Sequence, residues 1–527
     1  MMTTGLLTQM IFAPAVAAVL LGFVPPGFPV LLRRLAVLLS LVPFAVSVVV
    51  WLAFNDHAPG FQFVERTAWV PQLGISYYVG IDGISLLLIA LTTMLTPLVL
   101  LAAGDQIHTR MKGYVISVLL LESTMLGTLV ALDLVLFYVF WELMLVPMFL
   151  IIGVWGGERR VYASIKFILF TMVGSLPMLA SIVYMAVSYG AQADVGGQMS
   201  FALTDLYGLA LPRHAQIWSC LALVIAFAIK VPMWPLHTWL PDAHVEAPTG
   251  GSVILAGVML KMGTYGFVRF VMPLFADVLP LFMPWIGTLA VVGIIYGALV
   301  AMVQPDIKKL VAYSSVSHLG FVMLGLASMT SIGVAGAVYQ MVGHGLSTGA
   351  LFLLVGMVYE RRHTRQIDQF GGLWKQMPLY ASVFLLVTLS SIGLPGLNGF
   401  VGEFLILVGS FRTSVVLTTF AVSGVVLGAV YMLWMYQRVM FGPITNPANE
   451  KLADMQPREL LVMAPLLILI VVMGVYPAPF LAKIETSVAT VMDRARATHV
   501  VRLETPAAPP LSIASSAAHV HAGEARR

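Results

Sequence analysis

Four ionisable residues lie within long apolar stretches of the chain. Glu142 lies in "LVLFYVFWELMLVPMFLIIGVW", Lys261 in "SVILAGVMLKMGTYGFVRF" and Glu403 in "SIGLPGLNGFVGEFLIL", whereas Lys230 comes late in "IWSCLALVIAFAIKVP". A charge near the centre of a bilayer costs at least about 2.5 to 3.5 kcal/mol, and residues of this kind are commonly functional. Glu142 is about eight residues into its stretch, roughly 12 Å into a hydrocarbon core of about 30 Å. We expect all four side chains to share one layer near the middle of a membrane.

Three histidines accompany these groups. His318 in "LVAYSSVSHLGFVMLGL" and His344 in "AVYQMVGHGLSTGALFLLVG" fall at a similar depth, and His237 belongs to an interrupted stretch. Imidazole titrates near neutral pH and can both donate and accept a proton, so histidines between lysines and carboxylates suit a proton relay. For any single residue, a structural ion pair or a helix–helix hydrogen bond is an alternative explanation. The number of such groups at one depth favours the relay.

A contact between Glu142 and Lys230 would make a switch. At about 4 Å and an effective dielectric constant near 20, such a pair attracts by about 4 kcal/mol. Making or breaking the contact could therefore move a proton onto or off Lys230. The sequence indicates the depth of each residue but not the direction in which it points, so this pairing is a hypothesis.

Two apolar stretches carry prolines where a helix should continue. Pro232 and Pro235 in "FAIKVPMWPLHTWLPDAHVEAPTGG" follow Lys230, and Pro395 lies among glycines in "IGLPGLNGF". Proline removes a backbone hydrogen bond and clashes with the preceding turn. Irregular backbone at membrane depth is tolerated only where it is buried in protein or lines a wet cavity. We therefore expect broken helices and hydrated passages at both places.

The chain as a whole has the composition of a polytopic membrane protein. Of its 527 residues 59% are apolar and 10% are charged, and the mean hydropathy is +0.94. About twenty apolar residues are needed to cross a bilayer, and about fourteen segments qualify. We predict an all-α fold in which the seventh and twelfth spans are broken. The expected cores are 5–22, 30–54, 84–103, 113–131, 134–155, 164–188, 216–235, 251–272, 284–303, 307–328, 332–359, 378–411, 415–438 and 459–482.

These spans predict one membrane domain over residues 1–485 and a disordered tail over 486–527, which is rich in Ala, Pro and Ser. The two broken spans are five apart, which predicts inverted five-helix repeats over about 113–272 and 284–438. Basic residues concentrate in the loops after odd-numbered spans, so both termini should face the periplasm. No basic residue precedes the first apolar run, which we interpret as a retained span.

Composition also argues against several kinds of chemistry. Cys220 is the single cysteine and lies in an apolar run. We therefore expect no metal site and no iron–sulfur centre in this chain. The formal charge of +4 comes from small basic groups between apolar runs, which is where membrane topology places them. We do not expect a nucleic-acid partner.

Four segments carry a resemblance to a known family. They are "KVPMWPLHTWLPDAHVEAPTGGSVILAGVMLKMGTYGFVRF", "VAYSSVSHLGFVMLGL", "HGLSTGALFLLVGMVYERRHTR" and "LPGLNGFVGEF". Together they resemble the antiporter-like subunits of respiratory complex I. The "YERRHTR" run and a glutamate in the twelfth span resemble the bacterial M chain, the counterpart of mitochondrial chain 4. The resemblance covers about residues 75–480.

The resemblance implies a proton-pumping subunit of NADH:quinone oxidoreductase in the bacterial cytoplasmic (inner) membrane. Glu142 and Lys230 would form the coupling pair, Lys261 the central relay and Glu403 the exit-side carrier. Water would connect them through the three histidines His237, His318 and His344. NADH, FMN, iron–sulfur clusters and quinone would belong to partner subunits, and this chain would bind no cofactor. Its neighbours would be other membrane subunits, especially chains of the L and N type.

Two other functions stay open at this point. A subunit of a multi-subunit cation/proton antiporter would share the broken helices and the layer of lysine and glutamate, although the "YERRHTR" run argues against it. A scaffold subunit of a membrane hydrogenase-like or redox complex would carry the same charges for purely structural reasons.

Overall fold

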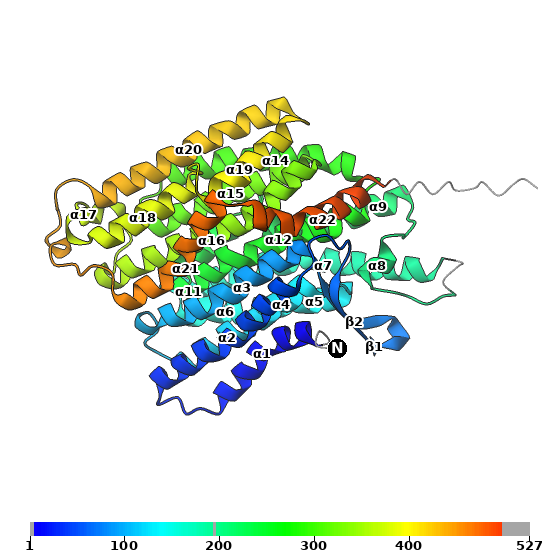
Figure 1. The fold of residues 1–527 in the computed structure, drawn as a ribbon, viewed down its shortest axis with the longest axis horizontal. Helices are drawn as coiled ribbons and strands as arrows, with labels where there is room; N and C mark the ends of the chain where they lie inside the picture. The colour runs from blue at the N-terminus through cyan, green and yellow to red at the C-terminus, as the bar shows by residue number, and fades with distance from the viewer. Residues whose placement is uncertain (1–4, 193–195, 498–527) are drawn as a thin grey trace, which may run out of the picture.

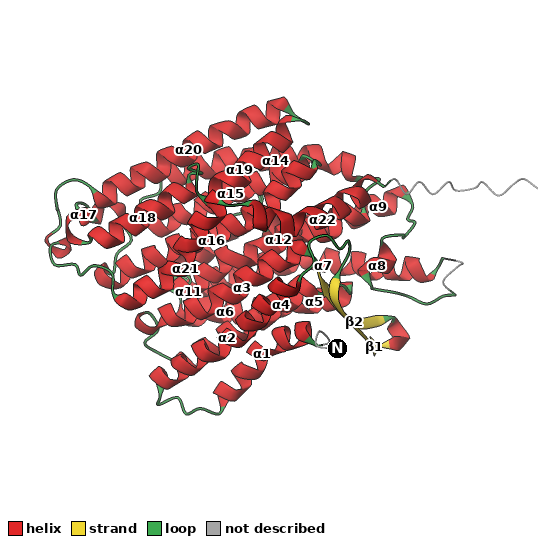
Figure 2. Ribbon diagram, viewed as in Figure 1, coloured by secondary structure: helices red, strands yellow, loops and turns green. Residues whose placement is uncertain are grey.

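The structure is a computed structural model that describes residues 5–192 and 196–497. Long helices run side by side in one elongated bundle, with a small hairpin at one end and the short helix α17 at the other (Figures 1 and 2). We call these the hairpin end and the α17 end. The first helices are α1 (Leu6–Gly22), α2 (Pro29–Ala53), α3 (Gly83–Ala102), α4 (Met111–Val130), α5 (Leu134–Leu143), α6 (Leu145–Trp155) and α7 (Arg160–Gly190).

The middle of the chain contains shorter pieces and the second half mostly long helices. The short pieces are α8 (Leu203–Leu206), α9 (Arg213–Lys230), α10 (Trp239–Glu246), α11 (Thr249–Ile254), α12 (Leu260–Gly266) and α13 (Met272–Leu274). Two π-helical segments, η4 (Leu255–Met259) and η5 (Phe267–Val271), flank α12. The remaining helices are α14 (Leu279–Met302), α15 (Ile307–Ala327), α16 (Ser331–Arg362), α17 (Leu373–Gln376), α18 (Pro378–Ser391), α19 (Asn398–Phe411), α20 (Val415–Met440), α21 (Pro457–Val475) and α22 (Ala478–Arg496).

The predicted helical membrane fold is confirmed. Eleven helical stretches of the described residues are long and apolar enough to cross a membrane, and α1, α18 and α19 are shorter apolar helices. The last span ends at Val475, short of the predicted 482, because Pro477 interrupts the chain before α22 begins. Residues 486–496, which we assigned to the tail, belong to α22, and residues 498–527 lie outside the described part.

One element of the structure is not helical. Strands β1 (Gln62–Val70) and β2 (Ile75–Ile81) form an antiparallel hairpin, in which Gln62 pairs with Ile81. Gly74 closes the turn with a φ of 72°, a conformation that favours glycine. The hairpin ends directly before α3 and caps one end of the bundle (Figure 2).

The core of the bundle is formed by the stretch 249–274 and by α16. In both, all residues of the most apolar 18-residue stretch are buried, whereas in α20 and α21 only 33% of the residues of that stretch are buried. The outer helices therefore present apolar side chains outward, as lipid or neighbouring membrane subunits require.

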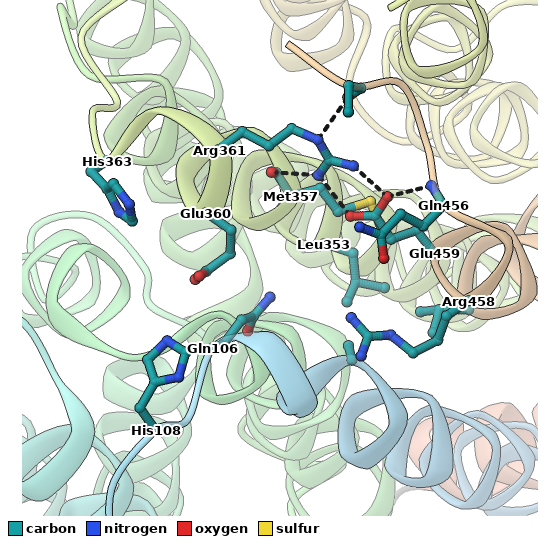
Figure 3. A pocket seen from close by; sticks show the side chains of 13 residues that line it. Gln106, His108, Leu353, Met357, Glu360, Arg361, His363, Gln456, Arg458 and Glu459 are labelled. Carbon is teal, nitrogen blue, oxygen red and sulfur yellow. Dashed lines mark hydrogen bonds and ion pairs between the residues drawn. The ribbon is translucent and has the colours of Figure 1, made fainter. Parts of the chain in front are cut away.

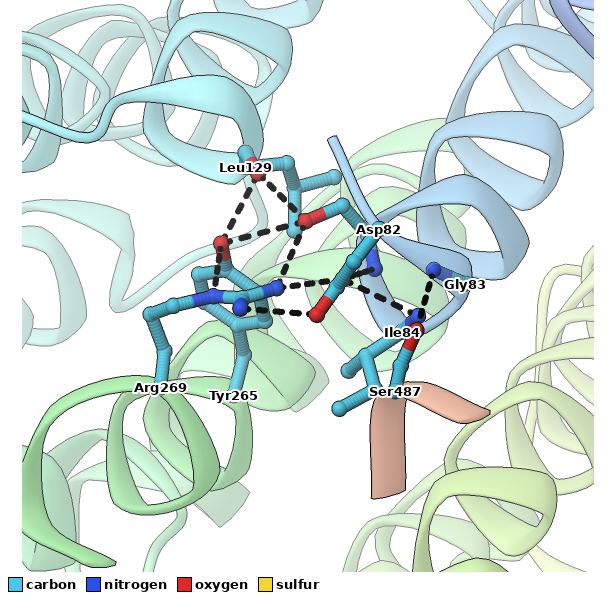
Figure 4. Close-up of polar contacts among 8 residues, drawn as sticks. Asp82, Gly83, Ile84, Leu129, Tyr265, Arg269 and Ser487 are labelled. Atoms are coloured by element: carbon cyan, nitrogen blue, oxygen red, sulfur yellow. Dashed lines mark hydrogen bonds and ion pairs between the residues drawn. The ribbon is translucent and has the colours of Figure 1, made fainter. Parts of the chain in front are cut away.

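A buried ionic network fixes the hairpin end of this core (Figure 4). Asp82 caps α3 by accepting hydrogen bonds from the backbone of Ile84 and Ser85, each at 3.1 Å. The Arg269 guanidinium from η5 donates to the two carboxylate oxygens of Asp82 at 2.8 and 2.5 Å. Tyr265 donates to the carbonyl of Leu129 in α4 at 2.8 Å. The network thus joins α3, α4 and the end of the central stretch.

Both predicted breaks are present. Helix α9 ends at Lys230, and the chain turns before α10 begins at Trp239. The Trp239 indole N–H donates to the carbonyl of Ile229 at 2.8 Å, so a carbonyl released by the break has a partner. The prolines therefore end α9 directly after the buried lysine.

The second break separates α18 from α19. Gly393 has a φ of +75°, and a Cβ on Gly399 would lie 2.2 Å from the carbonyl oxygen of Ser390. Asn398 donates to the carbonyl of Gly343 in α16 at 3.0 Å and accepts from Ser390 at 2.5 Å. Glycines and one amide thus hold α19 close to α16, in the turn before Glu403.

Candidate functional site

Lys261 and His344 make the first contact of a buried row. Lys261 lies in α12 and is fully buried. Its Nζ is 2.7 Å from Nδ1 of His344 in α16. The ammonium also donates to the carbonyl of Ala256 in the π-helical segment η4, and such segments are frequent at functional sites. The irregular helix therefore supplies an acceptor that orients the lysine toward the histidine.

His318 and Glu403 make the second contact. Nδ1 of His318 in α15 lies 3.0 Å from Oε1 of Glu403 in α19. Gln340 of α16 donates to the same oxygen at 3.3 Å. Both members of the pair are buried, which strengthens their interaction relative to a surface pair.

The two contacts adjoin each other. The rings of His318 and His344 have centroids 5.6 Å apart. A cavity of about 10 Å³ lies beside them and is lined by both histidines, Ser347, Ser390 and Gly399, among others. A space of this size holds about one water molecule. In the described part of the chain, Nε2 of each histidine has no hydrogen-bond partner, so both imidazoles keep a free nitrogen for proton exchange.

Lys230 and Glu142 do not form an ion pair. Lys230 is 1% exposed, and its Nζ lies 4.9 Å from the ring centroid of Trp141 and 5.8 Å from that of Phe167. Among the described residues, neither Nζ of Lys230 nor Oε1 of Glu142 has a hydrogen-bond partner, although both atoms are buried. The predicted contact is therefore absent from this conformation, and the aromatic rings hold the cation instead.

His237 lies apart from the row. It belongs to the turn between α9 and α10, and its ring faces Tyr296 at 5.2 Å and Tyr313 at 6.4 Å. Lys166 and Asp242, which form an ion pair at 2.7 Å, lie in the same region. The structure thus brings Lys261, His344, His318 and Glu403 together and places His237 beside a different polar cluster.

Two hollows open at the α17 end of the bundle. The larger has a volume of about 360 Å³ and lies between the ends of α3, α16 and α21 (Figure 3). One wall is held by Arg361, whose guanidinium donates to both oxygens of Glu459 at 2.7 Å. Glu360, Gln106 and His108 line the opposite side (Figure 3).

The second hollow adjoins the first at this end. Its volume is about 160 Å³, and it shares Gln106 and Glu360 with the first. Glu246 and Lys308 line it as well. Nζ of Lys308 donates to the carbonyl of Ala247 at 2.5 Å.

Two buried ionisable residues were missed by the sequence analysis. His244 is fully buried and stacks on Phe352 at 4.6 Å. It lies within electrostatic range of both Lys261 and Lys308, and neither ring nitrogen has a hydrogen-bond partner among the described residues. Its place in "PDAHVEAP", near the cytoplasmic face, indicated a loop or entry-side residue and not a member of the central row. Glu122 in α4 is also fully buried, and its place inside an apolar span was the signal that could have identified it.

No group of three or more His, Cys, Asp or Glu side chains that could hold a metal ion occurs among the described residues. Cys220 is buried and free.

Two family models match the chain. Residues 131–430 match "NADH:quinone oxidoreductase/Mrp antiporter, TM", and residues 31–128 match "NADH-ubiquinone oxidoreductase chain 4, amino terminus". NADH-quinone oxidoreductase subunit M of Rhodobacter capsulatus is 46% identical over 483 residues, which cover 90% of this chain and 94% of that protein.

Solved structures agree with this match. A chain of respiratory complex I from Thermus thermophilus with bound NADH superposes with a TM-score of 0.84 at 33% identity, covering 93% of this chain and all of that one. A chain of the Mrp complex from Dietzia sp. DQ12-45-1b has a TM-score of 0.80 at 20% identity, covering 93% of this chain and 100% of that chain. At that identity the likeness shows a shared fold alone.

Proposed function

Because this chain belongs to the family of NADH-quinone oxidoreductase subunit M and NADH-ubiquinone oxidoreductase chain 4, a proton-pumping, antiporter-like membrane subunit, we propose that four of its buried residues carry the protons. They are Lys261, His344, His318 and Glu403. The observation that carries this proposal is the pair of contacts at 2.7 and 3.0 Å that meet across two adjoining imidazoles.

The row works by passing a proton from a base to a carboxylate. Lys261 gives its proton to Nδ1 of His344, and that imidazole releases a proton from Nε2. One water in the adjoining cavity takes it to Nε2 of His318. Nδ1 of His318 then protonates Glu403, which carries the proton out of the row. Each transfer spans a contact or one water, which is the reach that proton transfer requires.

Lys230 and Glu142 serve as the coupling pair. The aromatic contact of Lys230 with Trp141 is worth about 2 kcal/mol when desolvated, less than the roughly 4 kcal/mol of an ion pair at 4 Å. A conformational change that brings Glu142 to Lys230 would therefore change the charge that Lys261 experiences. In the proposed switch, the observed arrangement, with Lys230 against Trp141, would be the separated state.

Protons reach the row from the α17 end. The two hollows, Lys308 and the buried His244 form a path toward Lys261, and His237 with Tyr296 and Tyr313 hydrates the first break. The basic loops support an orientation in which the α17 end faces the cytoplasm and both termini face the periplasm of a bacterial inner membrane. We also retain the inverted repeats over 113–272 and 284–438 as a proposal. The first break adjoins the coupling lysine Lys230, and the second adjoins the row residue Glu403.

The partners follow from the family. L- and N-type chains would pack against the exposed apolar helices, and NADH, FMN, iron–sulfur clusters and quinone would be handled by other subunits. The cation/proton antiporter remains the less favoured function, since its structural relative shares the fold at only 20% identity. Copurification with NADH-oxidising subunits distinguishes the two.

Substitution of His344 tests the row. In membrane vesicles that contain the assembled complex, H344Q should reduce NADH-driven proton pumping at least about tenfold, less than the roughly hundredfold at the low end of the usual contribution of a positioned proton-transfer group. His57 is exposed and lies outside the row and outside both hollows, so H57Q is the matched control and should pump at the normal rate. An assembled H344Q complex with normal pumping would contradict the proposal.

A further inference from the structure

Glu122 is a buried acid that the row does not use. It lies roughly 16 Å from the start of α4, near the middle of that helix. Its exposed fraction is 0%, and neither carboxyl oxygen has a hydrogen-bond partner among the described residues. A structural glutamate would be held by donors, so its burial needs another explanation.

Among the residues that the structure describes, no counter-charge lies beside Glu122. Helices α1, α2, α3, α5 and α6 pack against α4, and α1, α3 and α6 contain no Asp, Glu, Lys, Arg or His. Arg33 and Arg34 lie in the first two turns of α2, at the α17 end, and α5 adds only Tyr138 and Glu142. A carboxylate without a partner is too costly to bury, so the resting form is the neutral acid.

A row of hydroxyls leads away from this acid along α3. Thr96 faces Glu122, and Thr92 and Ser85 follow at helical spacings of four and seven residues on the same face. Ser85 donates to the carbonyl of Leu129 in α4 at 2.9 Å, so this face of α3 meets α4. We call Thr96, Thr92 and Ser85 the α3–α4 seam. Thr96 and Thr92 donate to backbone carbonyls of their own helix at 3.1 and 2.7 Å, and Ser85 also accepts from Arg269 at 3.1 Å. The seam therefore ends at the ionic network of Asp82 and Arg269.

The opposite face of α3 is apolar and separates Glu122 from the row. A Cβ on Gly257 would lie 2.6 Å from Leu95, and one on Gly345 would lie 2.6 Å from Leu91. These two leucines therefore fill the space between α3 and the helices that carry Lys261 and His344. Glu122 and the row occupy different sides of α3.

We infer that Glu122 is a second proton-binding site of this chain, a neutral carboxylic acid that lies beside the α3–α4 seam and holds an exchangeable proton. The exchange breaks and re-forms only the carboxyl O–H bond, and the proton passes to and from water. The inference goes beyond the proposed function, because exchange at Glu122 does not require a working row.

Infrared spectroscopy of the purified complex tests the inference. The carbonyl stretch of a protonated acid should be present in the wild type, shift in D₂O and be lost in E122Q. T96V keeps the acid and removes the hydroxyl that faces it, so the band should persist at a shifted frequency. E450Q, which changes an exposed glutamate, is the matched control and should leave the band unchanged.

A hydrophobic carbodiimide provides a second measurement that needs no variant. It adds to the O–H of a protonated carboxyl in an apolar site, so wild-type peptides that contain Glu122 should gain its mass. An unlabelled Glu122, a band that persists in E122Q, or a band that does not shift in D₂O would each overturn the inference. K261M separates the two proposals, since it should lose pumping and keep the Glu122 band.

Discussion

Replacing Glu403 with glutamine should block the last step of the row. At the observed 3.0 Å and an effective dielectric constant near 20, the carboxylate stabilises a protonated His318 by about 5.5 kcal/mol. Glutamine keeps the shape and the hydrogen-bonding reach of glutamate but loses this charge. Each 1.4 kcal/mol is a factor of ten, so the lost attraction corresponds to a factor of about ten thousand.

The assay is NADH-driven acidification of vesicles, normalised to the amount of assembled complex. We expect E403Q to pump at least about tenfold more slowly. Screening that removed most of the calculated attraction would still leave an effect of about a factor of ten. E403D retains the charge on a shorter side chain and should recover part of the rate. The remote E450Q is the control for a glutamate-to-glutamine change. Wild-type pumping by an assembled E403Q complex would refute the reasoning.

Two further predictions concern the scaffold that positions the row. G399A should open the second break and lower pumping, because its Cβ would lie 2.2 Å from the Ser390 carbonyl oxygen, whereas G428A, with no atom within 4 Å, should be neutral in the same vesicle assay. R269M should destabilise the subunit by about 3 to 5 kcal/mol, because it leaves Asp82 buried without its cation. A lower melting temperature of the complex, partly restored in the double variant R269M/D82N, would verify this; equal melting of R269M and wild type would not fit.

Hydropathy and proline predicted the helices and both breaks because these signals are local. Twenty apolar residues must cross a bilayer wherever they occur, and Pro232 removes a backbone donor in any packing. The depth of Lys261 and Glu403 could be counted from the ends of their spans in the same way. The hairpin over 62–81 lacks a comparable apolar run, and its strands depend on packing against the bundle.

Contacts between helices could not be predicted in this way, because they depend on helix rotation. Glu142 and Lys230 lie at suitable depths, yet the ammonium faces Trp141 in this conformation. His237 is next to the break in sequence but faces tyrosines of α14 and α15. His244 shows the reverse case, since a residue that resembled a loop histidine is buried beside Lys261.

The number of protons pumped per NADH oxidised by a complex that carries K261M tests the central claim most directly. Methionine fills the space of the lysine but cannot hold a proton, so transfer to His344 across the 2.7 Å contact becomes impossible. If this row carries protons, the ratio should fall below that of the wild type, while K483M, which removes a lysine paired with Asp56 outside the row, should keep it. An unchanged ratio in a fully assembled K261M complex would contradict the account.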